Sequence, residues 1–370
     1  MKKGVFLGLA LLTVSFVHAQ LNGDGYYRVQ NNKTGRFVYV TDDKGSISMS
    51  TTSADLYAII LWNDFNRAVS DPASVIYIQK VGTQYDLKSQ GTGVYSIIGF
   101  YVSLRANTDG TYYAYATSSG ITKYLGDSEF SDSPDGYLTS EGSGDYRKWK
   151  LNPIKQDDGN YFGVKSEFKD ATGNNYASFY AEFPFSFYST GMKAYYVTKI
   201  EGNMAVIKKV DNDLIPASTP LIIKCASDNT SENKLNIQTN SLAALSGNLL
   251  QGVYFQNSQP THYNQVAYNP STMRVLGLMS NGNVGFIKSS ISYLPANKSY
   301  LVVPAGTPDE LKLVTEEDYT AGVEDLNVND KKVAKGIYTL TGVHISDNSS
   351  SITGLHPGVY IVDGKKLVIR

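Results

Sequence analysis

Residues 101–116 read YVSLRANTDGTYYAYA, and two runs with alternating apolar side chains flank the dipeptide Asp109-Gly110. A type I′ turn needs positive φ at both central residues, and Asp-Gly supplies this at low cost. The stretch therefore predicts a β-hairpin with strands at Tyr101–Ala106 and Thr111–Ala116.

The same turn chemistry recurs twice. Asn281-Gly282 lies between apolar runs at 275–279 and 284–288, and Asp363-Gly364 lies between runs at 359–362 and 367–370. Short alternating runs broken by Gly, Asn and Asp dominate the rest, and 28 tyrosines fit a strand-rich chain. The sequence predicts an all-β protein.

The first residues have the pattern of an export signal. Lys2 and Lys3 precede an apolar run that is short for a membrane span, and small residues follow at Val17-His18-Ala19. We expect residues 1–19 to be a signal peptide cleaved between Ala19 and Gln20. The mature protein is then secreted or displayed at the cell surface, without membrane insertion.

Charge and cysteine content narrow the class of partner. Without Lys2 and Lys3 the chain has 31 basic residues against 34 acidic ones, a net charge near −3. This balance argues against nucleic acid as a partner. Cys225 is the only cysteine, so an intrachain disulfide is impossible.

Changes in composition suggest the domain limits. A polar break at 155–160 separates a first domain, 20–155, from a second, 160–314. Residues 315–330 are acidic, with no lysine or arginine, and are typical of a solvated linker. Residues 331–370 then form a small antiparallel β unit.

The second domain contains an internal repeat. Ile215-Pro216-Ala217 and the triplet Leu221-Ile222-Ile223 recur as Leu294-Pro295-Ala296 and Leu301-Val302-Val303, with the prolines 79 residues apart. Two related strand-turn-strand units that pack together predict a β-sandwich. We expect each apolar triplet to begin a strand buried on both faces.

The first domain shows fainter repetition. Trp62 and Trp149 lie 87 residues apart, about two lengths of a repeat near 43 residues. Three such units would fill the domain, and the middle one would lack tryptophan. This count suggests a β-trefoil built from β-hairpins.

Residues 25–40, GYYRVQNNKTGRFVYV, resemble the opening repeat of ricin-like β-trefoil lectin domains. In that family a strand, an Asn-x-x-Thr-Gly turn and a second strand begin each unit. The resemblance implies a trefoil fold and sugar binding. The family's sugar sites carry Gln-x-Trp, and the matching places here read Ile60-Leu61-Trp62 and Arg147-Lys148-Trp149.

Candidate ligand-binding residues follow from this resemblance. Asp42, Asp43 and Asp64 have carboxylates that would accept sugar hydroxyls, although ordinary turn residues explain them equally well. Trp62, Trp149 and Tyr146 offer aromatic faces for a pyranose ring. For the two tryptophans, which each end an alternating apolar run, core packing is the favoured role.

No catalytic or metal motif is evident. The mature chain keeps three histidines, none with a second ligand at metal spacing, and no nucleophile elbow or phosphate loop occurs. Cys225 lies in an apolar run, which indicates a buried thiol. We therefore expect no enzyme activity, no cofactor and no metal.

Two further resemblances concern the second half. Residues 183–187 and 295–301 look like motifs of secreted Bacteroidetes surface proteins, and residues 336–370 are similar to the ends of type IX secretion sorting domains. The first hypothesis is thus a non-catalytic secreted or surface protein that binds glycan or host matrix through its trefoil-like domain. The alternative is a structural protein that holds an envelope partner and has no sugar site. A glycoside hydrolase is a third, and would need two carboxylates roughly 5–10 Å apart. Ligand identity and oligomeric state stay open.

Overall fold

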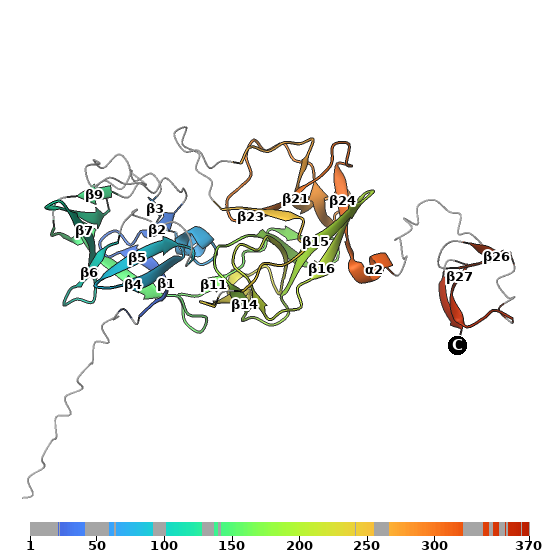
Figure 1. Cartoon of the computed structure of the whole chain (residues 1–370), viewed down its shortest axis with the longest axis horizontal. Coiled ribbons are helices and arrows are strands. Elements are labelled where there is room, and N and C mark those ends of the chain that lie inside the picture. The colour runs from blue at the N-terminus through green and yellow to red at the C-terminus, as the bar shows by residue number, and fades with distance from the viewer. Residues whose placement is uncertain are drawn as a thin grey trace, which may run out of the picture. The chain divides into compact units, whose positions relative to one another are not determined.

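The computed structural model describes residues 21, 23–40, 59–62, 64–91, 101–127, 137–139, 142–240, 242–254, 266–320, 336–339, 343–347, 352, 354–363 and 365–369; for 59–62, 118 and 137–139 it describes the backbone only. The chain divides between Leu313 and Val314 into two compact units. Short helices apart, the elements are strands in four antiparallel sheets (Figure 1), so the all-β prediction is confirmed. The predicted signal peptide and its cleavage site at Ala19 and Gln20 lie outside the described residues.

A first sheet occupies the beginning of the chain. Its strands are β1 (Gly25–Asn31), β2 (Phe37–Val40), β3 (Ile59–Trp62), β4 (Ile76–Val81), β5 (Gln84–Ser89), β6 (Ser103–Ala106), β7 (Tyr112–Ser118), β8 (Ile121–Gly126), β9 (Tyr137–Thr139) and β10 (Trp149–Pro153).

Six of these strands close into a ring. β1 pairs with β4, β4 with β5, β6 with β7, β7 with β10, and β10 with β1. The Tyr85–Val102 bridge joins β5 to the start of β6 and completes the circuit. Hairpins β2–β3 and β8–β9 are attached to β1 and β7. A six-stranded ring that carries hairpins is the arrangement of a β-trefoil, and we call residues 23–153 the trefoil part.

The two tryptophans occupy different places in this ring. Trp149 begins β10, a ring strand, just after the 3-10 helix η3 (Asp145–Arg147), whereas Trp62 ends β3, a hairpin strand. The position equivalent to Trp149 in the first repeat is Ile76, which begins β4 just after the 3-10 helix η2 (Pro72–Ser74). The expectation that the tryptophans mark a repeat near 43 residues was therefore wrong.

The Asn-x-x-Thr-Gly turn forms as expected. Asn31 is buried, its side-chain oxygen accepts hydrogen bonds from the backbone N–H groups of Lys33 and Thr34, and Gly35 has φ 74°. Next to this turn Arg36 forms a buried ion pair with Asp127 at the end of β8. The turn is thereby tied to the hairpin of the third repeat.

All three predicted hairpins form, but two have a different turn. At 109–110 and 281–282 only the glycine has positive φ, and the flanking pairs Asn107–Thr111 and Met279–Asn283 enclose three residues. This is a type I turn followed by a left-handed glycine, which also suits the strand twist. At the third hairpin Asp363 has φ 46°, and Gly364 lies outside the described residues.

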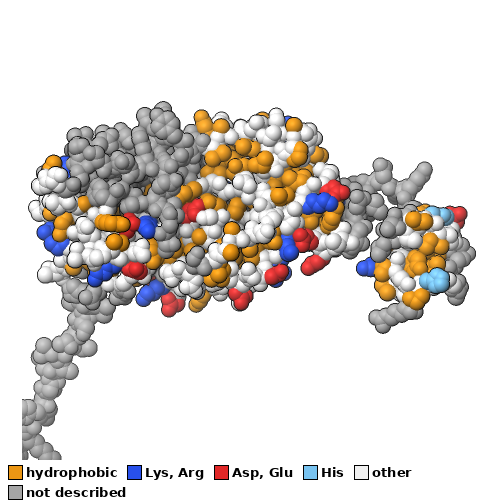
Figure 2. Space-filling model, viewed as in Figure 1, with side chains coloured by type: hydrophobic (Ala, Val, Ile, Leu, Met, Phe, Trp, Pro, Cys, Tyr) orange, Lys and Arg blue, Asp and Glu red, His pale blue; other side chains and the backbone are white. Residues whose placement is uncertain are grey.

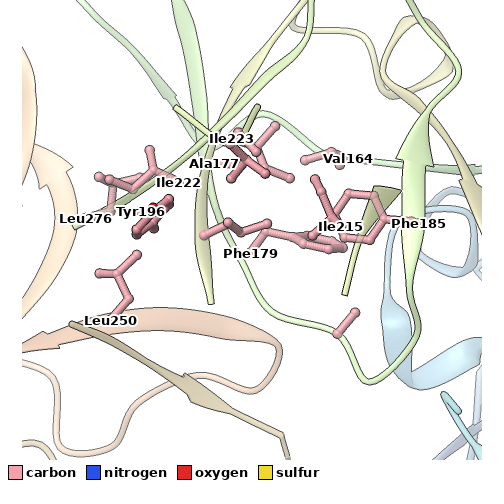
Figure 3. Close-up of a cluster of buried hydrophobic side chains, with 14 of the residues drawn as sticks. Val164, Ala177, Phe179, Phe185, Tyr196, Ile215, Ile222, Ile223, Leu250 and Leu276 are labelled. Carbon is pink, nitrogen blue, oxygen red and sulfur yellow. The ribbon is translucent and has the colours of Figure 1, made fainter. Parts of the chain in front are cut away.

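Residues 162–313 form two more sheets, which we call the middle part. The larger sheet contains β12 (Phe168–Lys169), β13 (Asn175–Phe179), β15 (Lys193–Glu201), β16 (Met204–Lys209), β18 (Leu221–Cys225), β20 (Leu250–Val253), β21 (Met273–Leu278), β22 (Val284–Ile287), β23 (Lys298–Val302) and β24 (Glu310–Thr315). The smaller contains β11 (Phe162–Gly163), β14 (Phe185–Phe187), β17 (Leu214–Ile215) and β19 (Lys234–Ile237). Figure 3 shows the core between them, where Phe179, Phe185 and Ile215 lie together.

The internal repeat of the middle part is visible in its topology. In each copy a hairpin forms, β15–β16 or β21–β22, and the next long strand, β18 or β23, returns beside the first hairpin strand. The residue two positions after each repeated proline, Ser218 or Asn297, has left-handed φ of 57° and 58°. Both copies therefore make the same chain reversal.

The apolar triplets differ between the copies. Leu221, Ile222 and Ile223 are fully buried in β18, as predicted, whereas Val302 in β23 is 48% exposed. Burial on both faces was thus the wrong expectation for the second triplet. β18 lies between β13 and β15 with the main core against it, while β23 lies next to the edge strand β20.

The trefoil and middle parts share one apolar core. The rings of Tyr26 and Tyr77, from ring strands β1 and β4, lie 4.9 Å apart, and the ring of Phe183 lies 6.1 Å from Tyr26. All three side chains belong to the main core cluster of the middle part. The two parts are thus packed into one compact unit.

The C-terminal unit is a small antiparallel sheet, as predicted. Its strands, in the order β26-β25-β27-β28, are β25 (Ile337–Thr339), β26 (His344–Ser346), β27 (Gly358–Val362) and β28 (Lys365–Ile369). Among its described residues only Gly336 and Ile337 are buried. Such a sheet buries too little apolar area to be very stable alone.

The beginning of the predicted acidic linker is helical. Residues Glu316–Thr320 form α2. The hydroxyl oxygen of Thr315 accepts a hydrogen bond from the Asp318 N–H, and the same hydroxyl donates to the Asp318 carboxylate. Thr315 thus caps the helix through its side chain, which explains why the acidic stretch begins with a helical turn. Residues 321–330 lie outside the described residues, and the limits 155–160 and 330 stay predictions. Among the helices that the structure describes, none is long and apolar enough to cross a membrane.

The shared core predicts that the trefoil and middle parts unfold together. Phe183→Ala removes a buried ring from the middle part and should lower the free energy of unfolding by about 3–5 kcal/mol. Both tryptophans lie in the trefoil part, so tryptophan fluorescence during urea denaturation reports that part alone. We expect Phe183→Ala to move the fluorescence midpoint to lower urea.

Tyr188→Ala is the matched control, because Tyr188 is 54% exposed in the same part. It should leave the midpoint where it is. An unchanged fluorescence midpoint in Phe183→Ala, together with loss of middle-part structure by circular dichroism, would show that the two parts are independent.

Removal of residues 323–370 should leave the first unit intact. Among the described residues, every buried hydrophobic side chain except that of Ile337 belongs to residues 1–313, so the core of the first unit is built without residues 323–370. We therefore expect its melting temperature to stay within about 2 °C, a change below 1 kcal/mol. A calorimetric drop well beyond this would mean that the C-terminal unit is structural.

Candidate functional site

A cleft of about 450 Å³, lined by polar and apolar side chains, lies where the trefoil part meets the middle part. The trefoil part contributes residues from 64 to 72, and the middle part contributes residues from four separate segments. The lining residues are Asp64, Asn66, Arg67, Ser70, Asp71, Pro72, Val164, Lys165, Ala177, Ser178, Phe179, Thr230, Ala296, Asn297 and Lys298. Ligand sites often form at such interfaces.

Two short capped helices shape the trefoil wall of the cleft. Asp64 caps α1 (Phe65–Ala68) by accepting a hydrogen bond from the Arg67 N–H at 3.2 Å, and Asp71 caps η2 in the same way through the Ala73 N–H at 3.0 Å. Asp and Asn are favoured at such caps because they satisfy a free N–H group. Each carboxylate keeps a second oxygen for another partner.

Arg67 connects these two helices. Its Nε lies 3.1 Å from the Asp71 carboxylate, and its guanidinium lies 5.2 Å from the centre of the Tyr39 ring. Burial, and then the nearby Asp71 charge, raises the pKa of the Tyr39 hydroxyl. The hydroxyl therefore stays protonated and donates to the Asp64 carbonyl oxygen at 3.2 Å. Tyr39 thus holds both Asp64 and Arg67 in place.

A backbone contact joins this wall to the middle part. The Gly163 N–H donates to the Val69 carbonyl at 2.8 Å. A Cβ on Gly163 would lie 2.4 Å from the Thr230 carbonyl oxygen, so a larger residue there would push Thr230 away. Glycine at this position therefore permits the close approach that forms one end of the cleft.

Asn297 forms a second link between the parts. It is 5% exposed, and its side-chain N–H₂ donates to the Gln90 side-chain oxygen at 3.1 Å and to the Tyr180 carbonyl at 3.3 Å. The same Gln90 oxygen accepts from the Glu182 N–H at 3.2 Å. A trefoil side chain thus holds two segments of the middle part beside the cleft.

The two lysines in the cleft differ in their partners. Lys298 is neutralised by Glu167, 2.6 Å away, and also donates to the Ser178 carbonyl at 3.4 Å. Lys165 is exposed, and no carboxylate within the described ranges lies at ion-pair distance from it. Lys165 and the free oxygen of Asp64 therefore offer a donor and an acceptor to a ligand.

The sequence-predicted site residues are only partly brought together. Asp64 lines the cleft, whereas Tyr146 is half-buried and its carbonyl accepts a hydrogen bond from Asn31. Trp149 has no exposed surface, and its indole N–H donates to the Leu125 carbonyl at 2.9 Å. The ring of Trp149 therefore belongs to the core and has no face for a sugar.

The other three predicted residues are Asp42, Asp43 and Trp62. Asp42 and Asp43 lie outside the described residues, and the side chain of Trp62 is not described. Their ligand-binding role stays a prediction.

Sequence reasoning missed most of the cleft. Lys165, Thr230 and Asn297 are far from Asp64 along the chain, and no local pattern connects them. Two local signals were available: the caps at Asp64 and Asp71, seven residues apart, and the repeated proline followed two residues later by Asn297. Neither signal identifies a ligand without the fold.

No metal or nucleophile site is apparent in the described part of the chain, where no three His, Cys, Asp or Glu side chains are grouped as ligands. Cys225 is buried, and burial raises the pKa of its thiol to about 12. The thiol is therefore protonated at neutral pH.

Comparison with protein-family models finds no match, and none is found among curated protein sequences. Among solved structures, the Rhizoctonia solani agglutinin is similar at 12% identity over 35% of this chain and 95% of its own, with a TM-score of 0.19. A mosquitocidal holotoxin is similar at 11% identity over 77% of this chain and 42% of its own, with a TM-score of 0.27. The agglutinin from Abrus precatorius is similar at 12% identity over 78% of this chain and 95% of its own, with a TM-score of 0.22. Because these TM-scores are low, the trefoil arrangement rests on the strand pairing alone.

The buried thiol gives a test of the native packing. Because thiol reagents attack the thiolate, Cys225 should resist a chromogenic disulfide reagent at pH 8 in the native protein. It should react fully once urea unfolds the chain. Rapid reaction without denaturant would contradict the described burial.

Proposed function

We propose that this chain is an exported, non-catalytic carbohydrate-binding protein that holds its glycan in the cleft between the trefoil and middle parts. One observation carries the proposal. The exposed Asp64, an acceptor on the trefoil wall, and the exposed Lys165, a donor on the middle wall, line one 450 Å³ cleft. Sugar hydroxyls act as both donors and acceptors and suit such a surface.

The rest of the cleft is consistent with this ligand class. Asn66 and Asn297 add amide groups, and Pro72 and Phe179 add apolar surface between the polar ones. Ligand sites usually combine apolar walls with a few polar groups that fix orientation. Asp64 is also one of the three aspartates, with Asp42 and Asp43, that the sequence singled out as acceptors for sugar hydroxyls.

Export and surface display are part of the same proposal. They are supported by the predicted signal peptide at 1–19 and by the similarity of residues 336–370 to type IX secretion sorting domains. The absence of a catalytic motif in the sequence supports a binding role. On this view the C-terminal unit delivers the protein and the first unit binds.

Glycan binding is tested with residues 20–370 on an array of plant and mammalian polysaccharides, followed by calorimetry on the best ligand. Asp64→Asn retains the helix cap but removes the charge. Lys165→Gln removes the donor charge. Hydrogen bonds to charged groups contribute roughly 1.5–3 kcal/mol, so each variant should weaken binding at least about tenfold.

Lys150→Gln is the matched control, because Lys150 is exposed on β10 and is not among the cleft residues. It should bind like the parent protein. Silence across the array, or full binding by both cleft variants, would overturn the proposal. Release of reducing sugar from a bound polysaccharide would overturn its non-catalytic part.

A further inference from the structure

A second cavity, of about 360 Å³, lies in the middle part and is largely apolar. Its walls include Val275, Leu278, Ile287, Ile291, Leu294 and Tyr300. Figure 2 shows hydrophobic side chains gathered on the visible surface over β21 and β23. Leu278 and Ile291 are 46% and 38% exposed, so the cavity opens to solvent.

The cavity exists because of the way strand faces alternate in β21 and β23. Leu276 and Leu301 point into the main core, whereas Val275 and Tyr300 pack on a separate small cluster with Leu294. Val275 is paired with Tyr300 on one side and with Ile287 on the other. The second face of this sheet region therefore has an apolar lining that the main core does not fill.

A glycine keeps this lining open. A Cβ on Gly277 would lie 2.5 Å from Cδ1 of Ile287, so any larger residue there would push the Ile287 side chain into the space beside it. Gly277 also lines the cavity. Strand β21 thus has no side chain at Gly277, the position where it lines the cavity.

Charge at the rim selects against an ionic ligand. Glu167 and Lys298 are the charged residues that line the cavity, and their side chains are 2.6 Å apart. Glu167 also accepts a hydrogen bond from the Ser178 N–H at 2.8 Å. A charged ligand would have to break this pair or enter an apolar space unpaired, and either is costly.

Size fits a hydrocarbon group. An apolar cavity of about 150 Å³ is large enough to bind benzene, and this one is more than twice that volume. We propose that the cavity binds the hydrocarbon chain of an uncharged amphiphile, whose polar head lies at the rim near the Glu167–Lys298 pair. This inference goes beyond the proposed glycan site, although Ser178 and Lys298 line both cavities.

The test uses neutral 1-alkanols from hexanol to decanol with residues 20–370, measured by calorimetry. Burial of one methylene contributes about 0.8 kcal/mol, so the affinity should rise about fourfold per carbon until the cavity is full and then level off. The alkanols contain no sugar, so their binding is independent of the glycan proposal.

Variants separate the cavity from general surface adhesion. Leu278→Asp and Ile291→Asp place a charge at the rim and should weaken decanol binding at least tenfold. Val302→Asp is the matched control, since Val302 is an exposed apolar residue of β23 that does not line the cavity. It should leave the affinity within twofold, with circular dichroism confirming the fold of each variant.

Charged analogues test the head group. Decanoate and decylammonium should each bind at least tenfold more weakly than decanol. Absence of alkanol binding, equal weakening by Val302→Asp, or tighter binding of either ion would each overturn the inference.

Discussion

The buried guanidinium of Arg28 is the interaction on which the cleft depends. Arg28 lies in β1 with no exposed surface, and its Nε donates to the Ala68 carbonyl at 3.0 Å and to the Ser74 hydroxyl at 3.3 Å. Its Nη1 donates to the Asn160 side-chain oxygen at 2.6 Å. One cation thus joins the first ring strand, the segment that carries the cleft wall, and the segment that enters the middle part.

Burial of this charge has a cost that these hydrogen bonds offset in part, since Nη2 has no hydrogen-bond partner among the described residues. Burial lowers the pKa of Arg28 to about 10, so it is still protonated at neutral pH. A desolvated cation costs several kcal/mol unless carbonyl and hydroxyl oxygens surround it. Two of the three acceptor oxygens belong to Ala68 and Ser74, so these hydrogen bonds fix the segment beside Asp64 and Asp71, which line the cleft.

Local chemistry was readable in the sequence because it depends on neighbouring residues. The Asn31 turn, the three hairpins and the repeated proline units all have short-range causes: a side chain that bonds the next backbone groups, or a glycine that accepts positive φ. The turn type at Asp109-Gly110 was misjudged, because a three-residue turn with one left-handed glycine uses the same dipeptide. The spacing of Trp62 and Trp149 misled for a similar reason, since it was counted without knowing which strands close the ring.

The cleft could not be predicted in the same way. Asp64 and Lys165 share a surface only because Gly163 bonds Val69 and because Tyr26 packs against Phe183. These contacts join segments about 90 to 160 residues apart, and a side-chain pattern carries no information on such distant pairs until the fold is known. What the sequence does show is the local signal, such as an Asp that can cap a helix or an Asn that can adopt left-handed φ.

In the duplicated middle part, the same chain reversal has a different role in each copy. In the first copy Ser218 has left-handed φ, bonds the Ala181 carbonyl and leads into a triplet that is wholly buried. In the second copy Asn297 has the same φ, but its amide reaches Gln90 and lines the cleft, and the strand that follows exposes Val302. Asn is one of the few non-glycine residues that adopt this conformation, and here its amide bonds the distant Gln90 and Tyr180. Both copies therefore contribute to the main core, the first through Ile222 and Ile223 and the second through Leu276 and Leu301, and the second copy also contributes side chains to both cavities.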